Sequence, residues 1–124
     1  MTDTIADLIN RINNAKGADA QTARVPYAKM KIAILSVLKE LGYINDFKKA
    51  EDDSIEIVIS GSRKQFSKIK RVSTPSRRYY VGAKNIPRVK GGFGEMIIST
   101  PSGVISATKA RKSGLGGELI CEVY

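Results

Sequence analysis

The chain has 124 residues, of which 42% are hydrophobic, and it carries 21 Lys or Arg against 12 Asp or Glu. It contains no His and one Cys, which removes the commonest general base, His-based triads and ordinary zinc sites, so we expect no enzyme, no cofactor and no metal. No apolar run is long enough to span a bilayer, and the acidic start does not resemble a signal peptide, so we expect no membrane partner.

The charge is divided unevenly along the chain. Residues 1–62 hold 8 Lys or Arg and 9 Asp or Glu, a net charge of −1, whereas residues 63–124 hold 13 and 3, a net charge of +10. Net charge decides partners rather than topology. The basic half therefore indicates a polyanionic partner, and RNA, DNA or an anionic membrane surface are the candidates. We expect two units with these bounds, 1–62 and 63–124.

Residues 4–16 are predicted to form a helix because apolar residues recur there at helical spacing, namely Ile5, Leu8, Ile9, Ile12 and Ala15. Asp3 is the expected N-cap and Gly17 the expected end. Residues 18–26 are predicted to be extended.

A second helix is predicted over 28–41, with an apolar face that begins at Met30 and an end at Gly42. Two strands follow, at 43–49 and 54–60, joined by an acidic turn. The order helix, strand, helix, strand, strand predicts a small α/β unit.

The second half has short β-branched runs separated by Gly, Pro, Ser and Thr, which predicts a β-rich unit with strands at 69–72, 79–81, 96–99, 104–106 and 119–123. One short helix fits 107–112, with Ser106 as its cap and Gly114 as its end. The predicted fold class is thus α+β: an α/β N-terminal unit packed on a β-rich C-terminal unit that carries one short helix.

The basic stretch 63–78 ends in Arg77 and Arg78, followed directly by Tyr79 and Tyr80. One interpretation is a solvated strand face, and the other is anion binding, which the charge of this half favours. For the tyrosines, strand alternation predicts one ring in the core and one outside, in preference to base stacking.

Two turns of this half carry further hypotheses. The segment 91–94, Gly-Gly-Phe-Gly, lacks the Lys-Ser/Thr of a phosphate-binding loop and is predicted to be a tight turn before a strand. The hydroxyl-rich run 99–103 is either a plain turn or a close backbone contact with RNA, and the residues alone favour the turn.

The segment 109–118 is a short basic helix that runs into a glycine-rich turn. Its Glu118 either forms an ion pair with a neighbouring basic side chain or accepts a hydrogen bond from a nucleobase, and the sequence leaves both open. Cys121 lies among apolar residues and is interpreted as a small core residue.

In their order along the chain, several of these segments together resemble the bacterial type of the small-subunit ribosomal protein eight family. The resemblance covers essentially the whole chain, and its pieces are Asp3-Thr4-Ile5-Ala6-Asp7, Arg11-Ile12, Asn14-Ala15, Val25-Pro26 with Lys29 and Lys31, Ile86-Pro87-Arg88-Val89 with Gly91-Gly92-x-Gly94, Ser99-Thr100-x-x-Gly103, and Ala110-Arg111 with Gly114-x-Gly116-Gly117-Glu118.

The resemblance implies a non-catalytic structural protein that binds the central domain of small-subunit rRNA early in assembly. Together with the charge pattern, it makes these residues of the basic half candidates for RNA binding: Arg77, Arg78, Ser99, Thr100, Ser102, Gly103, Lys109, Arg111, Lys112, Gly116, Gly117 and Glu118. It implies a second RNA contact from the first half, at Thr4, Arg11, Asn14, Lys29 and Lys31.

The same resemblance implies neighbouring ribosomal proteins as partners, with small-subunit ribosomal protein five expected, and a place on the ribosome in the cytoplasm, an organellar ribosome being the alternative. It permits translational repression through the protein's own operon mRNA at the same surface. The chain departs from the family at Ala28, where a capping Ser is usual, and at Pro101-Ser102, where Ser-Lys is usual. Because Pro has no N–H, position 101 lacks the backbone donor that a residue other than Pro would supply.

Overall fold

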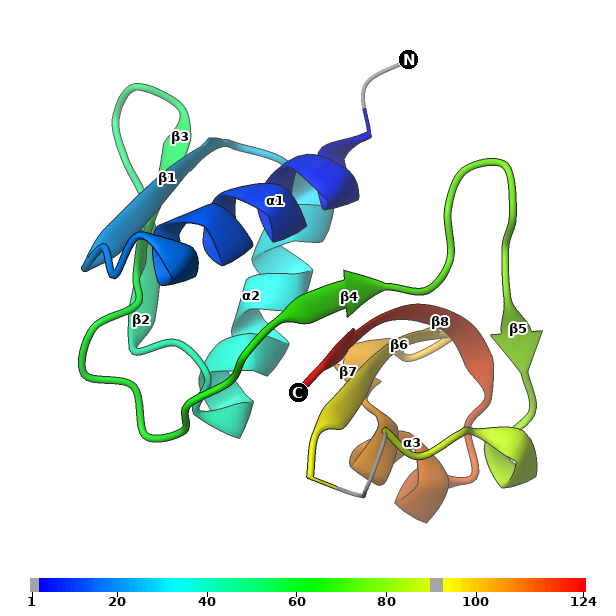
Figure 1. Cartoon of the computed structure of the whole chain (residues 1–124). Coiled ribbons are helices and arrows are strands. Elements are labelled where there is room, and N and C mark those ends of the chain that lie inside the picture. Colours follow the sequence, from blue (N-terminus) through cyan, green and yellow to red (C-terminus); the bar gives the residue numbers. More distant parts are fainter. Residues whose placement is uncertain (1–2, 90–92) are drawn as a thin grey trace. The chain divides into compact units, whose positions relative to one another are not determined.

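The computed structural model in Figure 1 describes residues 3–89 and 93–124. The chain divides into two compact units, with one ending at Gln65 and the other beginning at Phe66. These are called unit 1 and unit 2 below, and their border lies three residues beyond the sequence-based one. No helix in the described ranges has the length and apolar character needed to cross a bilayer.

Unit 1 contains the elements α1 (Thr4–Gly17), β1 (Thr22–Pro26), α2 (Lys29–Leu41), β2 (Asp46–Lys49) and β3 (Ser54–Val58). The strands form an antiparallel sheet in the order β1-β3-β2. The predicted order of helix, strand, helix, strand, strand is therefore confirmed. Burial alternates along β3, where Ile55 and Ile57 point into the core and their neighbours are partly exposed, so the two helices cover one face of this sheet.

Two of the four helix ends in unit 1 follow the predicted caps. The Asp3 carboxylate accepts a hydrogen bond from the Ala6 N–H at 3.1 Å, and Gly42 takes the left-handed φ of +90° that ends α2. Gly17, in contrast, remains inside α1, and the left-handed residue that turns the chain is Asp19, with φ of +55°. Ala28 begins α2 without a side-chain cap.

The strands predicted at 43–49 and 54–60 are longer than the observed strands β2 and β3. The residues Tyr43 and Ile44 are buried one after the other, and the Tyr43 N–H donates to the Leu38 carbonyl, so this segment completes the end of α2 instead of starting a strand. At the other end, the N–H groups of Ile59 and Ser60 both donate to Gln21 O, which is not a ladder pattern. Met30, predicted on the apolar face, is 38% exposed, so it is not part of the buried face of α2.

Unit 2 contains β4 (Ile69–Arg71), β5 (Tyr80–Val81), the short 3₁₀ helix η1 (Ala83–Asn85), β6 (Glu95–Thr100), β7 (Gly103–Ser106), α3 (Ala107–Ser113) and β8 (Gly117–Val123). Its antiparallel sheet has the order β4-β8-β6-β7, and β5 pairs with the first part of β8. The predicted β-rich unit with one short α-helix is confirmed, and the three-residue η1 was not predicted because it is too short to show a period.

The core of unit 2 lies between α3 and the sheet, with Ile86, Val89, Met96, Ile98, Ala107, Ala110 and Leu119 as its buried members. The register between β6 and β8 shifts at Ile97/Ile98, and this bulge lets three successive residues, 119–121, be buried together. Cys121 is fully buried as predicted, and burial raises the pKa of its thiol to about 12.

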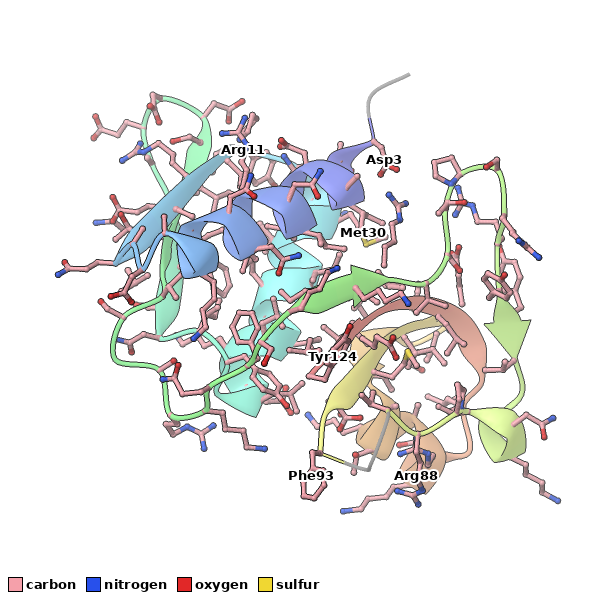
Figure 2. All side chains as sticks on the ribbon, in the orientation of Figure 1. Asp3, Arg11, Met30, Arg88, Phe93 and Tyr124 are labelled. Carbon is pink, nitrogen blue, oxygen red and sulfur yellow. The ribbon has the colours of Figure 1, made fainter. Side chains whose placement is uncertain are left out.

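The predicted turn at 91–94 is only partly covered, because Gly91 and Gly92 lie outside the described residues. Phe93 is 92% exposed, and Figure 2 shows its ring pointing away from the unit. Gly94 is required for close packing and not for a turn conformation, because a methyl group there would overlap the Val123 carbonyl oxygen.

Candidate nucleic-acid interface

One end of the unit 2 sheet gathers residues that are far apart in the sequence. In the register of β8, Glu118 lies opposite Tyr80 of β5 on one side and opposite Ser99 of β6 on the other. The β6–β7 turn, residues 100–103, closes the same end of the sheet. We call this set, Arg78, Tyr80, Ser99–Gly103 and Gly116–Glu118, the sheet-end surface.

The β6–β7 turn is held by the side chain of Thr100. Its hydroxyl donates to the Gly103 carbonyl at 2.8 Å and accepts from the Ser102 N–H at 3.1 Å. Gly103 has φ of +115°, a conformation that side chains rarely adopt. Thr100 is therefore buried and shapes the turn, while Ser102 and Pro101 are exposed at its tip.

Two glycines allow the strands to meet closely at this end. A methyl group on Gly117 would overlap the Ser99 carbonyl oxygen, and one on Gly116 would overlap the Val81 carbonyl oxygen. Gly116 and Gly117 thus set the spacing that brings the β6–β7 turn beside Glu118. The sequence predicted these glycines as RNA contacts, and the structure shows their packing role at this end of the sheet.

Glu118 forms an ion pair with Arg78. The Arg78 guanidinium lies 3.0 Å and 3.3 Å from the two carboxylate oxygens, and the Glu118 side chain is only 17% exposed. Of the two possibilities left open by the sequence, the ion pair with a neighbouring basic side chain is the one that the unbound protein forms. The carboxylate is thereby held in one orientation at the centre of the sheet-end surface.

The tyrosine prediction was wrong, because both rings are exposed: Tyr79 is 40% and Tyr80 is 69% exposed. The two-residue strand β5 is too short to impose alternation between core and solvent. The Arg77 guanidinium lies over the Tyr79 ring at 5.7 Å, within the range of a cation–π contact. Tyr80 belongs to the sheet-end surface and was missed as a site residue.

The basic residues of α3 differ in their surroundings. The helix begins at Ser106, whose hydroxyl accepts from the Lys109 N–H, and ends at Gly114 in the left-handed region, as predicted. Lys109 and Lys112 are exposed, whereas Arg111 is partly buried and donates to the Pro87 carbonyl at 3.0 Å. Arg111 therefore ties α3 to the segment before β6.

In unit 1, the predicted contact residues Thr4, Arg11 and Asn14 lie on one face of α1, at successive spacings of seven and three residues. Arg11 is exposed (Figure 2) but held: its Nε lies 2.9 Å from Asp7, and its guanidinium donates to the Arg24 carbonyl at 3.0 Å. Lys29 is exposed at the first turn of α2.

Lys31 does not fit the prediction of a direct RNA contact, and its burial corrects that expectation. The side chain is 2% exposed, and its Nζ lies 2.9 Å from both the Asp7 carboxylate and the Pro26 carbonyl. The hydrogen bonds from Lys31 and Arg11 lower the pKa of Asp7 below its usual value. Lys31 therefore anchors α2 to α1 and β1.

No group of three or more metal-ligating residues occurs in the part of the chain that the structure describes. The family model described as ribosomal protein S8 matches residues 3–124. Relatives named small ribosomal subunit protein uS8 are 46% identical in Oleidesulfovibrio alaskensis and 43% in Hahella chejuensis, each over 100% of this chain, and over 99% and 98% of the relative.

The chain therefore belongs to the ribosomal protein S8 family, whose members are structural, non-enzymatic proteins of the small ribosomal subunit. The relatives match it from end to end, so the family assignment covers both units.

Proposed function

We propose that the chain binds directly to the central domain of the small-subunit rRNA and supports assembly of the subunit. The observation that carries this proposal is the register of β8, which unites a hydroxyl turn, two close-packed glycines and a held Glu118 at one end of a basic unit. Unit 2 has 11 Lys or Arg and 3 Glu, a net charge of +8, whereas unit 1 has a net charge of +1.

The two properties of unit 2 have different tasks in this proposal. The cations, which include Arg77, Lys109 and Lys112, attract the phosphate backbone and give affinity that depends on salt. The exposed hydroxyl of Ser102 and the backbone of the turn contact riboses and base edges, where shape is recognised. Tyr80 offers an exposed ring beside Glu118, on which an unpaired base can stack.

A binding experiment tests this division of tasks. The full chain is titrated onto a central-domain rRNA fragment and onto a random duplex, each at several salt concentrations. We expect the logarithm of affinity to fall with the logarithm of salt by about 0.7–0.9 per phosphate contact. Ser102→Ala is expected to weaken binding to the fragment about fivefold, the equivalent of about 1 kcal/mol, and to leave the duplex unchanged. Equal losses on both RNAs would contradict specific recognition.

Unit 1 is proposed to supply a second contact through residues of α1 and of the α2 start, namely the partly exposed Thr4 and the exposed Arg11, Asn14 and Lys29. Lys31 is excluded from this set because it is buried. Lys29→Gln tests the contact, with Lys39→Gln as control, because Lys39 is an exposed lysine paired with Asp46 near the other end of α2. We expect only the first change to lower affinity for the rRNA fragment.

The same surface would serve translational repression, because shape recognition accepts an mRNA element that copies the rRNA shape. Competition between the operon mRNA and the rRNA fragment tests this second function, and simultaneous binding of both would exclude a shared surface. We propose neighbouring ribosomal proteins as protein partners, with small-subunit ribosomal protein five expected from the family resemblance.

A further inference from the structure

Unit 2 has a surface cavity of about 350 Å³ away from the β6–β7 turn. Its floor is apolar and contains the buried side chains of Met96 and Leu119. Tyr79 and Pro87 form part of its walls. The volume lies at the lower end of the range used by small-molecule sites, which suits a single planar group.

The cavity is bordered by three cations, Lys70, Arg71 and Arg88, and by one acid, Glu122. Arg88 and Lys70 are exposed, and Lys70 lies opposite Glu122 in the register of β4 and β8. An excess of positive charge around an apolar floor matches a ligand that is both aromatic and anionic. A carboxylate at the edge adds an acceptor for the amino group of a base.

The backbone that carries the Tyr79 ring is fixed by hydrogen bonds on both sides of the residue. Its N–H donates to the Ser73 hydroxyl at 2.9 Å, and its carbonyl accepts from the Leu119 N–H at 2.9 Å. The Arg77 guanidinium lies over its ring. Because the backbone at Tyr79 is already ordered, a ligand that stacks on the ring does not have to order this segment.

We propose that this cavity binds one unpaired nucleotide, with its base against Tyr79 and the apolar floor and its phosphate at the bordering cations. The inference rests on the proposed RNA function for the kind of ligand, but it assigns a site separate from the sheet-end surface. The occupant is a nucleotide and not a protein segment, since the charge excess, the aromatic wall and the small volume occur together.

The test uses the full chain with methyl-labelled methionine and AMP as the probe. Met96 lies in the cavity floor, and Met30 in unit 1 is an internal control. We expect the Met96 methyl signal to shift with AMP in a saturable way, while Met30 does not move. Inorganic phosphate at the same concentration is expected to leave Met96 unchanged. A Met96 signal that ignores AMP, or that responds equally to phosphate, overturns the proposal.

Substitutions inside and outside the cavity test whether AMP binds at this site. Tyr79→Ala should weaken AMP binding at least about fivefold, the lower limit for loss of base stacking, and Tyr79→Phe should retain it. Arg88→Gln should weaken it, whereas Lys84→Gln and Tyr80→Ala, which change residues outside the cavity, should not. If AMP fails to bind while the rRNA fragment still binds, the nucleotide site is wrong and the proposed function stands.

Discussion

Asp7→Asn tests whether the buried Lys31 stabilises unit 1 through its ion pair. Removing one partner of a buried pair costs about 3–5 kcal/mol. The Asp7 side chain is 29% exposed and Lys31 keeps its bond to the Pro26 carbonyl, so we expect a smaller loss of about 2–3 kcal/mol in the free energy of unfolding. Urea unfolding at pH 7, followed by circular dichroism, measures this loss.

Two controls make the result specific to the pair. Asp46→Asn removes an exposed carboxylate paired with Lys39 and should change stability much less than Asp7→Asn does. The double variant Asp7→Asn/Lys31→Met removes both charges and should recover most of the loss, since an apolar side chain tolerates the buried position. If Asp7→Asn is as stable as Asp46→Asn, the pair does not hold α2 in place.

The same pair predicts a dependence on pH. Lys31 and then Arg11 lower the pKa of Asp7, so the folded carboxylate holds its proton less strongly than the unfolded one. The stability it contributes is present above its unfolded pKa and is lost as the pH falls through the folded pKa. Asp7→Asn should therefore show a weaker loss of stability than the parent chain between about pH 5 and pH 2.

Three further predictions concern single positions. Ala28→Ser should stabilise unit 1 by about 1 kcal/mol in urea unfolding, because α2 has an extended N-cap residue without a capping side chain; no gain would contradict this. Gly117→Ala should destabilise unit 2, whereas Gly17→Ala, with open space at its Cβ, should stabilise α1 by about 0.5–1 kcal/mol; equal thermal shifts would refute the packing argument. The Cys121 thiol, with its pKa raised to about 12, should react with a thiol reagent only on unfolding, and stability should fall as the pH rises above the unfolded pKa of about 9; rapid modification of the folded chain would contradict its burial.

The sequence predicted the elements whose signals are local. Apolar periodicity located both long helices, and side-chain chemistry identified the caps at Asp3 and Ser106 and the left-handed ends at Gly42 and Gly114. These features depend on residues within one or two helical turns. Strand ends were less certain because the segment after α2 is tied to the helix by backbone bonds that leave no pattern in the sequence.

The candidate site was predicted in composition but not in arrangement. Sequence reasoning found the hydroxyl turn and the glycines, but only the register of β8 shows that Tyr80, Glu118 and Ser99 lie in one row. The burial of Lys31 could not be predicted from the sequence either, because its hydrogen-bond partners come from α1 and β1. An exposed and a buried lysine of a helix look alike until the neighbouring elements are placed.

The central claim is that the sheet-end surface recognises a shaped RNA, and an amide shift map tests it most directly. The labelled full chain is titrated with the central-domain rRNA fragment at a salt concentration that suppresses binding of random duplex. The account predicts the largest changes at 99–103 and 116–118, with smaller changes in the sheet at β4. Saturable binding that leaves both segments unchanged would contradict it.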